Sequence, residues 1–153
     1  MNWKDWGDKK LTRELTKEER LARQEIVDML RRGEIRTSDD FYRAGHFFHH
    51  GSNFRDYALG LALFAVSRHL GELWGKNTYA VALDRFLLSI KQPQYFVTQF
   101  EKQRGKWIIS RYRKGIIDKE RAKYFVESLA KTKKQVKQMN RDESILMVNK
   151  GVI

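Results

Sequence analysis

The chain has 153 residues, of which 41% are hydrophobic and 33% are charged, and this composition is typical of one globular domain rather than of a disordered chain. It contains no cysteine, which excludes disulfides, thiolate metal sites and cysteine nucleophiles. The N-terminus is too charged for a signal peptide, and no apolar run is long enough for a membrane span. We therefore expect a cytoplasmic protein without a membrane partner.

The basic residues are concentrated in the last third of the chain. Residues 101–141 hold 14 basic and 4 acidic side chains, a net charge of +10, and the whole chain has +12. Such an excess favours an anionic partner, for example nucleic acid. A solvated, lysine-rich helix face would give the same composition, so both interpretations stay open.

Apolar residues at helical spacing predict four helices in the first 90 residues, at 11–32, 40–50, 54–73 and 78–90. Thr16 with Glu19 resembles a capping box at the start of the first helix, and Gly33 ends that helix. Pro93 prevents the fourth helix from continuing.

Aromatic and β-branched runs at 95–100 and 106–112 flank a polar turn at 101–105 and predict a β-hairpin, which would be the only sheet. A last helix is expected from an N-cap at Asp118 to about Asn140, with Ala122 and Phe125 facing inward. The predicted fold is mainly α: a single domain of residues 1–153 with about five helices and one hairpin. Its core covers about 11–140, and 1–10 and 141–153 are weakly structured tails.

Polar residues interrupt the apolar sequence between Leu83 and Phe100. Helical geometry places Asp84 on a buried face and turns Arg85 away from it by about 100°, so each side chain needs a partner from elsewhere. Two explanations fit this pattern. The polar side chains line a pocket, or Asp84 binds a loop or a helix N-terminus and has an architectural role.

Three histidines, His46, His49 and His50, lie within five positions at the end of the second predicted helix. His46 and His50 have the spacing of two metal ligands, but no suitable third ligand lies nearby, so we expect no metal site. His50 precedes a glycine turn and titrates near neutral pH, as a general base must. The chain has no phosphate-binding loop, dinucleotide-binding motif or serine nucleophile elbow, and we expect no cofactor.

Segments 39–51, 82–100 and 116–121 together resemble a family of small bacterial helical proteins known only as a domain of unknown function. The resemblance covers residues 15–140. The matching positions are His50, Gly51, Asp84, Arg85, Gln94, Thr98, Gln99, Asp118 and Arg121, with Asn140 closing the pattern. The family pattern has glutamine where this chain has His49 and glycine where it has Val97. The resemblance implies that these residues belong together, and it implies no activity.

The leading hypothesis is a cofactor-independent enzyme, a hydrolase, lyase or isomerase, that acts on a small polar or anionic ligand. His50 would be the general acid–base and Asp84 would orient it. The substrate would be bound by Arg85, Gln94, Thr98, Gln99, Arg121 and His49.

The second hypothesis is a nucleic-acid-binding module in which aromatic rings stack on bases and cations contact phosphates. Its residues are Arg104, Lys106, Trp107, Arg111, Tyr112, Arg113, Lys131, Lys133, Lys134 and Lys137. A third hypothesis is a protein-interaction partner whose polar residues are purely structural. None of the three specifies an oligomeric state.

Overall fold

The computed structural model describes residues 15–71 and 75–149. Within these ranges the chain forms six helices and one two-stranded antiparallel sheet, which confirms a mainly α fold with one small hairpin. None of the described helices is long and apolar enough to cross a membrane.

The four N-terminal helices lie close to their predicted positions. They are α1 (Lys17–Arg31), α2 (Ser38–His49), α3 (Phe54–His69) and α4 (Gly75–Ser89). α1 begins with the expected capping box, in which the Glu19 amide donates to the Thr16 hydroxyl at 3.2 Å and the Thr16 amide donates to the Glu19 carboxylate at 2.9 Å. Residues 11–14 and 72–73 of the predicted helices lie outside the described residues.

Glycines allow α2 and α3 to approach each other closely. A Cβ atom on Gly60 would lie 2.8 Å from the backbone nitrogen of His49, and one on Gly45 would lie 2.7 Å from the Phe64 ring. Beside this contact is the first hydrophobic cluster, which is formed by Ile35, Ala44, Phe48 and Leu63. The close packing of α2 on α3 therefore holds the backbone of His49 against Gly60.

The hairpin is shorter than predicted and has a tighter turn. β1 (Phe100–Gln103) pairs with β2 (Lys106–Ile109), so the turn consists of Arg104 and Gly105 alone, with φ of 49° and 77°. Two positive φ values are what a tight type I′ hairpin turn requires. The predicted hairpin is thus confirmed, but its first strand is wrong over residues 95–99 and its turn is shorter than 101–105. The amides of Tyr95, Phe96 and Thr98 donate to Asp84 instead of to a strand.

The last predicted helix is two helices, α5 (Asp118–Ala122) and α6 (Leu129–Asn149). Phe125 lies between the two helices and has a φ of 54°, which no helical residue adopts. Its side chain is 62% exposed. Ala122 is exposed too, so the prediction that both residues face inward is wrong. Asp118 is not an N-cap but the first residue of α5, and its carboxylate accepts from the Leu129 amide at 2.8 Å. The predicted tail is also wrong as far as Asn149, because α6 continues through it.

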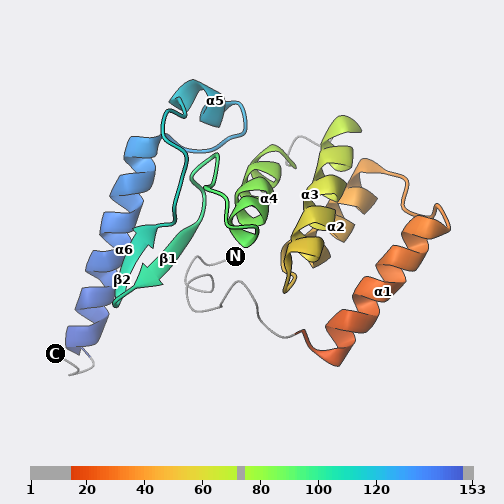
Figure 1. Ribbon diagram of the computed structural model, residues 1–153, viewed down its shortest axis with the longest axis horizontal. Coiled ribbons are helices and arrows are strands. Elements are labelled where there is room, and N and C mark those ends of the chain that lie inside the picture. The colour runs from red at the N-terminus through yellow and green to blue at the C-terminus, as the bar shows by residue number, and fades with distance from the viewer. Residues whose placement is uncertain (1–14, 72–74, 150–153) are drawn as a thin grey trace.

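The helices and the hairpin follow one another across the molecule, with α1 at one end and α6 at the other (Figure 1). α2, α3 and α4 follow α1, and the hairpin packs on α6 through β2. A second hydrophobic cluster joins Trp107 of β2 to Val136 and Met139 of α6. α4 lies between the N-terminal helices and the hairpin, and it carries Asp84.

Candidate functional site

Asp84 is fully buried, and its carboxylate accepts four hydrogen bonds from the segment that follows α4. Oδ1 accepts from the backbone N–H groups of Tyr95 at 2.6 Å and Phe96 at 2.7 Å. Oδ2 accepts from the amide and the hydroxyl of Thr98 at 2.9 Å and 2.8 Å. Burial raises the pKa of Asp84, and these hydrogen bonds act in the opposite direction. The carboxylate therefore fixes the fold of residues 95–98.

The segment that Asp84 binds contains a strained residue. Val97 has a φ of 63° and is 1% exposed. A left-handed conformation is unfavourable for a β-branched side chain and costs on the order of 1–3 kcal/mol unless the surroundings impose it. Glycine adopts such a φ freely. The hydrogen bonds to Asp84 on both sides of Val97 hold it there.

Two glutamine side chains complete the same segment. Gln94 is fully buried; its amide donates to the carbonyls of Gln99 at 3.0 Å and Ser110 at 2.7 Å, and its Oε1 accepts from the Gln99 amide at 2.9 Å. Gln99 donates from Nε2 to the Thr98 hydroxyl at 3.0 Å. Both glutamines are thus engaged in internal hydrogen bonds, mostly with the backbone.

Arg121 closes the network from α5. It is fully buried, and its Nε donates to the Glu127 carbonyl at 2.8 Å while Nη2 donates to the Thr132 hydroxyl at 2.7 Å. Its Nη1 donates to the Phe96 carbonyl, and burial lowers its pKa. The structure thus brings together five of the predicted site residues in what we call the polar junction: Asp84, Gln94, Thr98, Gln99 and Arg121.

The remaining predicted site residues form a separate histidine cluster. Arg85 Nη1 donates to the His49 carbonyl at 2.7 Å, and its pKa is lowered by burial. His49 is 3% exposed, and burial and the nearby Arg85 charge hold its pKa well below the usual value. The His50 ring lies 6.3 Å from that of His46 and 5.1 Å from that of His49. Burial also lowers the pKa of His46.

No hydrogen bond among the described contacts joins Asp84 to a histidine, because all four bonds of the carboxylate go to residues 95–98. The acid–base pairing of His50 with Asp84 therefore stays a prediction. Within the described residues no group of three or more histidine, aspartate or glutamate side chains could hold a metal ion.

All basic residues predicted for nucleic-acid binding are exposed, whereas the two predicted aromatic residues are not. Trp107 is 8% exposed because it packs in the second hydrophobic cluster, and Tyr112 is half-buried beside Gln94. Lys131 is exposed but pairs with Glu127 at 2.7 Å. The others are exposed and have no ion pair within the described part of the chain: Arg104, Lys106, Arg111, Arg113, Lys133, Lys134 and Lys137.

Four cations occupy one flank of α6. The side of the helix that faces the hairpin is marked by Thr132, Val136 and Met139, which are all buried. At about 100° per residue, four exposed cations fall within an arc of about 100° that contains no acidic side chain between residues 129 and 143. We call this arc the cationic flank; its members are Lys133, Lys134, Lys137 and Arg141.

The acidic residues of α6 lie away from the cationic flank. Glu143 pairs with Lys102 of the hairpin, and Asp142 accepts from Gln138 at 2.7 Å. Sequence reasoning missed Arg141, although its position one turn after Lys137 is a signal that could have identified it. It also missed Thr132, the partner of Arg121, which shows no distinctive signal in the sequence.

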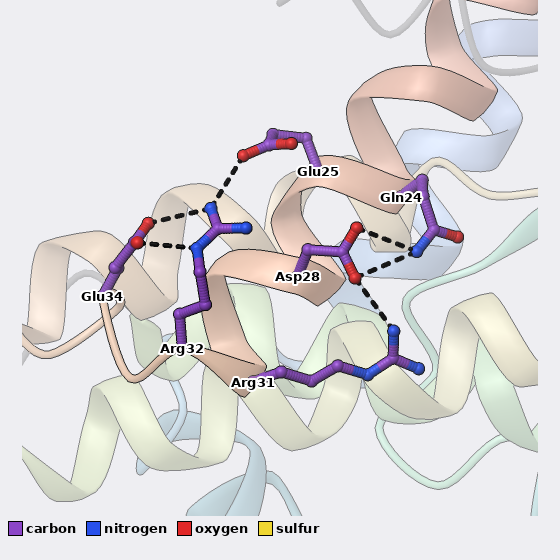
Figure 2. A network of polar contacts seen from close by, with 6 residues as sticks. All are labelled: Gln24, Glu25, Asp28, Arg31, Arg32 and Glu34. Atoms are coloured by element: carbon purple, nitrogen blue, oxygen red, sulfur yellow. Dashed lines mark hydrogen bonds and ion pairs between the residues drawn. The ribbon is translucent and has the colours of Figure 1, made fainter.

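Arg31, the last residue of α1, and Arg32, which caps the helix, provide a contrast, because nearby carboxylates neutralise them. Figure 2 shows Arg32 between Glu25 at 2.9 Å and Glu34 at 2.7 Å, and Arg31 donating to Asp28 at 2.9 Å. Such exposed pairs add little stability, but they cancel the local charge. Among the described residues, no carboxylate forms an ion pair with a cation of the cationic flank.

Asn140 fixes the hairpin to α6. Its Oδ1 accepts from the Trp107 amide at 2.7 Å, and its Nδ2 donates to the Trp107 carbonyl at 2.9 Å. The side chain thus pairs with the backbone of β2 as a neighbouring strand would. Hairpin and α6 therefore form one unit.

Comparisons of the chain with protein-family models, with curated proteins and with solved structures found no match. The polar junction, the histidine cluster and the cationic flank are therefore the features that bear on function.

Proposed function

We propose that the protein binds nucleic acid through a basic surface formed by the hairpin and α6. The observation that carries the proposal is the cationic flank of α6, where four exposed cations have no carboxylate partner among the described residues. Cations presented in this way release the counterions of a phosphate backbone, which is the main source of affinity in sequence-independent binding.

The hairpin extends this surface. Arg104 lies in its turn and Lys106 begins β2, and both are exposed. The two hydrogen bonds between Asn140 and the backbone of Trp107 hold the hairpin against α6. A rigid support reduces the entropy that binding would otherwise cost. The two sets of cations would then act as one surface.

Catalysis by His50 and Asp84 has less support. The Asp84 carboxylate is occupied by four hydrogen bonds from the protein itself, and the Arg121 guanidinium is fully buried among internal acceptors. These contacts favour a structural role for the polar junction, as in the third hypothesis. The junction would connect the N-terminal helices to the unit that carries the basic surface.

A mobility-shift assay with DNA and RNA at about 50 mM salt tests the proposal. Wild-type protein should retard nucleic acid, and a charge-reversal variant of the flank (Lys133→Glu, Lys134→Glu, Lys137→Glu) should not. The matched control carries the same three charge changes on exposed residues elsewhere (Lys17→Glu, Arg55→Glu, Lys91→Glu). Circular dichroism should show that all three proteins are equally helical. Failure of the wild type to retard any DNA or RNA would reject the proposal.

A further inference from the structure

We infer that the ligand is the phosphate backbone of a double helix, bound without sequence preference, rather than the bases of a single strand. This inference rests on the proposed function and deepens it. Three observations carry it: the burial of the hairpin aromatic rings, the regular spacing of the flank cations, and the hydrogen bonds that Asn140 and Gln138 make within the protein.

Proteins that bind single strands stack successive bases on exposed aromatic rings. The described hairpin offers no such ring, because Trp107 is 8% exposed and Phe100 is packed against the same cluster. Lys102 Nζ lies 5.8 Å from the centroid of the Trp107 ring, so this cation also covers the ring. The hairpin therefore presents charge and not stacking surface.

The flank cations form a regular row. Lys133, Lys137 and Arg141 follow one another at intervals of four residues, which is a rise of about 6 Å on an α-helix. A rigid row of charges complements a regular row of phosphates such as a duplex displays. A single strand would have to be ordered to match it, which costs conformational entropy.

Two amide side chains close to the flank, those of Asn140 and Gln138, are engaged in other hydrogen bonds. Asparagine and glutamine read adenine with both atoms of the amide group. Asn140 uses both atoms of its amide on the Trp107 backbone, and the Gln138 amide donates to Asp142. Three of the four flank cations are lysines, which contact phosphates as point charges. The flank is thus suited chiefly to the recognition of backbone charge.

The salt dependence of the binding constant provides a quantitative test of the inference. The four flank cations alone predict a slope of about −3.6 in a plot of log K against log salt for a DNA duplex, and contacts from Arg104 and Lys106 would make it steeper. Replacing three lysines removes about three contacts, which should make the slope shallower by about 2.7. Between about 50 and 200 mM salt the wild type should lose about two orders of magnitude in affinity.

Fluorescence anisotropy with a labelled DNA duplex measures this slope. The variant is Lys133→Gln, Lys134→Gln, Lys137→Gln, and the control is Lys17→Gln, Arg55→Gln, Lys91→Gln. Unlabelled competitors are a second duplex of unrelated sequence, an RNA duplex, and one strand of the labelled DNA. We expect the unrelated duplex to compete as well as the labelled sequence and the single strand to compete less well. The better competitor of the DNA and RNA duplexes identifies the natural class of duplex.

Several outcomes would overturn the inference and leave the proposed function standing. A single strand that competes as well as the duplex would do so, as would a strong preference for one sequence. An unchanged slope in the flank variant would instead show that other cations contact the duplex, and it would reject the proposed surface together with the inference. Absence of binding to every probe at low salt would reject the proposed function itself.

Discussion

The hydrogen bonds of Asp84 predict that Asp84→Asn destabilises the protein strongly. Asparagine has nearly the same shape, but it presents an acceptor oxygen to only two of the four donors. Its NH₂ group faces the other two. The lost bonds run to a charged, buried acceptor, and such bonds contribute about 1.5–3 kcal/mol each. We therefore expect a loss of about 3 kcal/mol or more in the free energy of unfolding.

Asp84→Ala removes all four bonds and leaves three buried backbone donors unsatisfied. That loss is comparable to the whole stability of a small domain, about 5–15 kcal/mol, so this variant should not fold stably. Thr98→Val is the milder perturbation. It removes the hydroxyl that donates to Asp84 at 2.8 Å and accepts from Gln99 Nε2 at 3.0 Å but keeps the Thr98 amide bond, and it should cost about 1–3 kcal/mol.

Urea denaturation followed by circular dichroism at 222 nm measures these differences. The matched control is Asp39→Asn, which removes the carboxylate of an exposed pair with Arg43 at 2.6 Å and should change stability by less than about 0.5 kcal/mol. If Asp84→Asn were as stable as this control, the structural role assigned to the polar junction would be wrong. A catalytic role for the carboxylate would then regain support.

Three further predictions concern the histidine cluster, the helix contact and the hairpin. Because the pKa of His49 is lowered in the folded state, the unfolded chain binds more protons, and stability should fall as the pH drops below about 6.5, by up to about 1.4 kcal/mol per unit. His49→Gln should flatten this dependence in urea titrations at several pH values, and equal dependence in both proteins would contradict the assignment. Gly60→Ala should cost about 1–3 kcal/mol despite the better helix propensity of alanine, because its Cβ would lie 2.8 Å from a backbone nitrogen of α2. If the variant were as stable as wild type in thermal denaturation, α2 and α3 would be able to move apart at little cost. Asn140→Ala should cost about 1–3 kcal/mol in urea titrations by releasing β2 from α6, and a loss below about 0.5 kcal/mol would disprove this anchoring role.

The sequence was sufficient to locate α1 to α4, because their apolar spacing and their end signals agree. Thr16 with Glu19 at the start of α1 and Gly33 after its end illustrate such end signals. The structure has the capping box and a positive φ at Gly33. It also identified Asp84 as a buried group in need of a partner, and the architectural explanation considered for it agrees with the observed hydrogen bonds. Local periodicity was the useful information in both cases.

Two elements were misplaced because tertiary contacts override local preference. The aromatic and β-branched residues at 95–98 favour a strand, but their N–H groups bind the Asp84 carboxylate, which is distant in sequence. The break between α5 and α6 falls at Phe125, where no glycine or proline marks it. Arg121 explains this break, since its side chain binds the carbonyl of Glu127 and the hydroxyl of Thr132.

The candidate site was predictable in composition but not in geometry. Net charge indicated a basic last third, and the lysines named there include Lys133, Lys134 and Lys137. Aromatic residues interleaved with arginines suggested base stacking. The burial of Trp107 depends on how the hairpin packs on α6, which no local pattern specifies.

An NMR titration of isotope-labelled protein with a short DNA duplex at about 50 mM salt is the most direct measurement of where the ligand binds. The proposed function predicts amide shift changes confined to residues 133–141 of α6 and to the hairpin around Arg104 and Lys106. Changes centred on the His49–His50 and Asp84 region, or no changes at all, would contradict it.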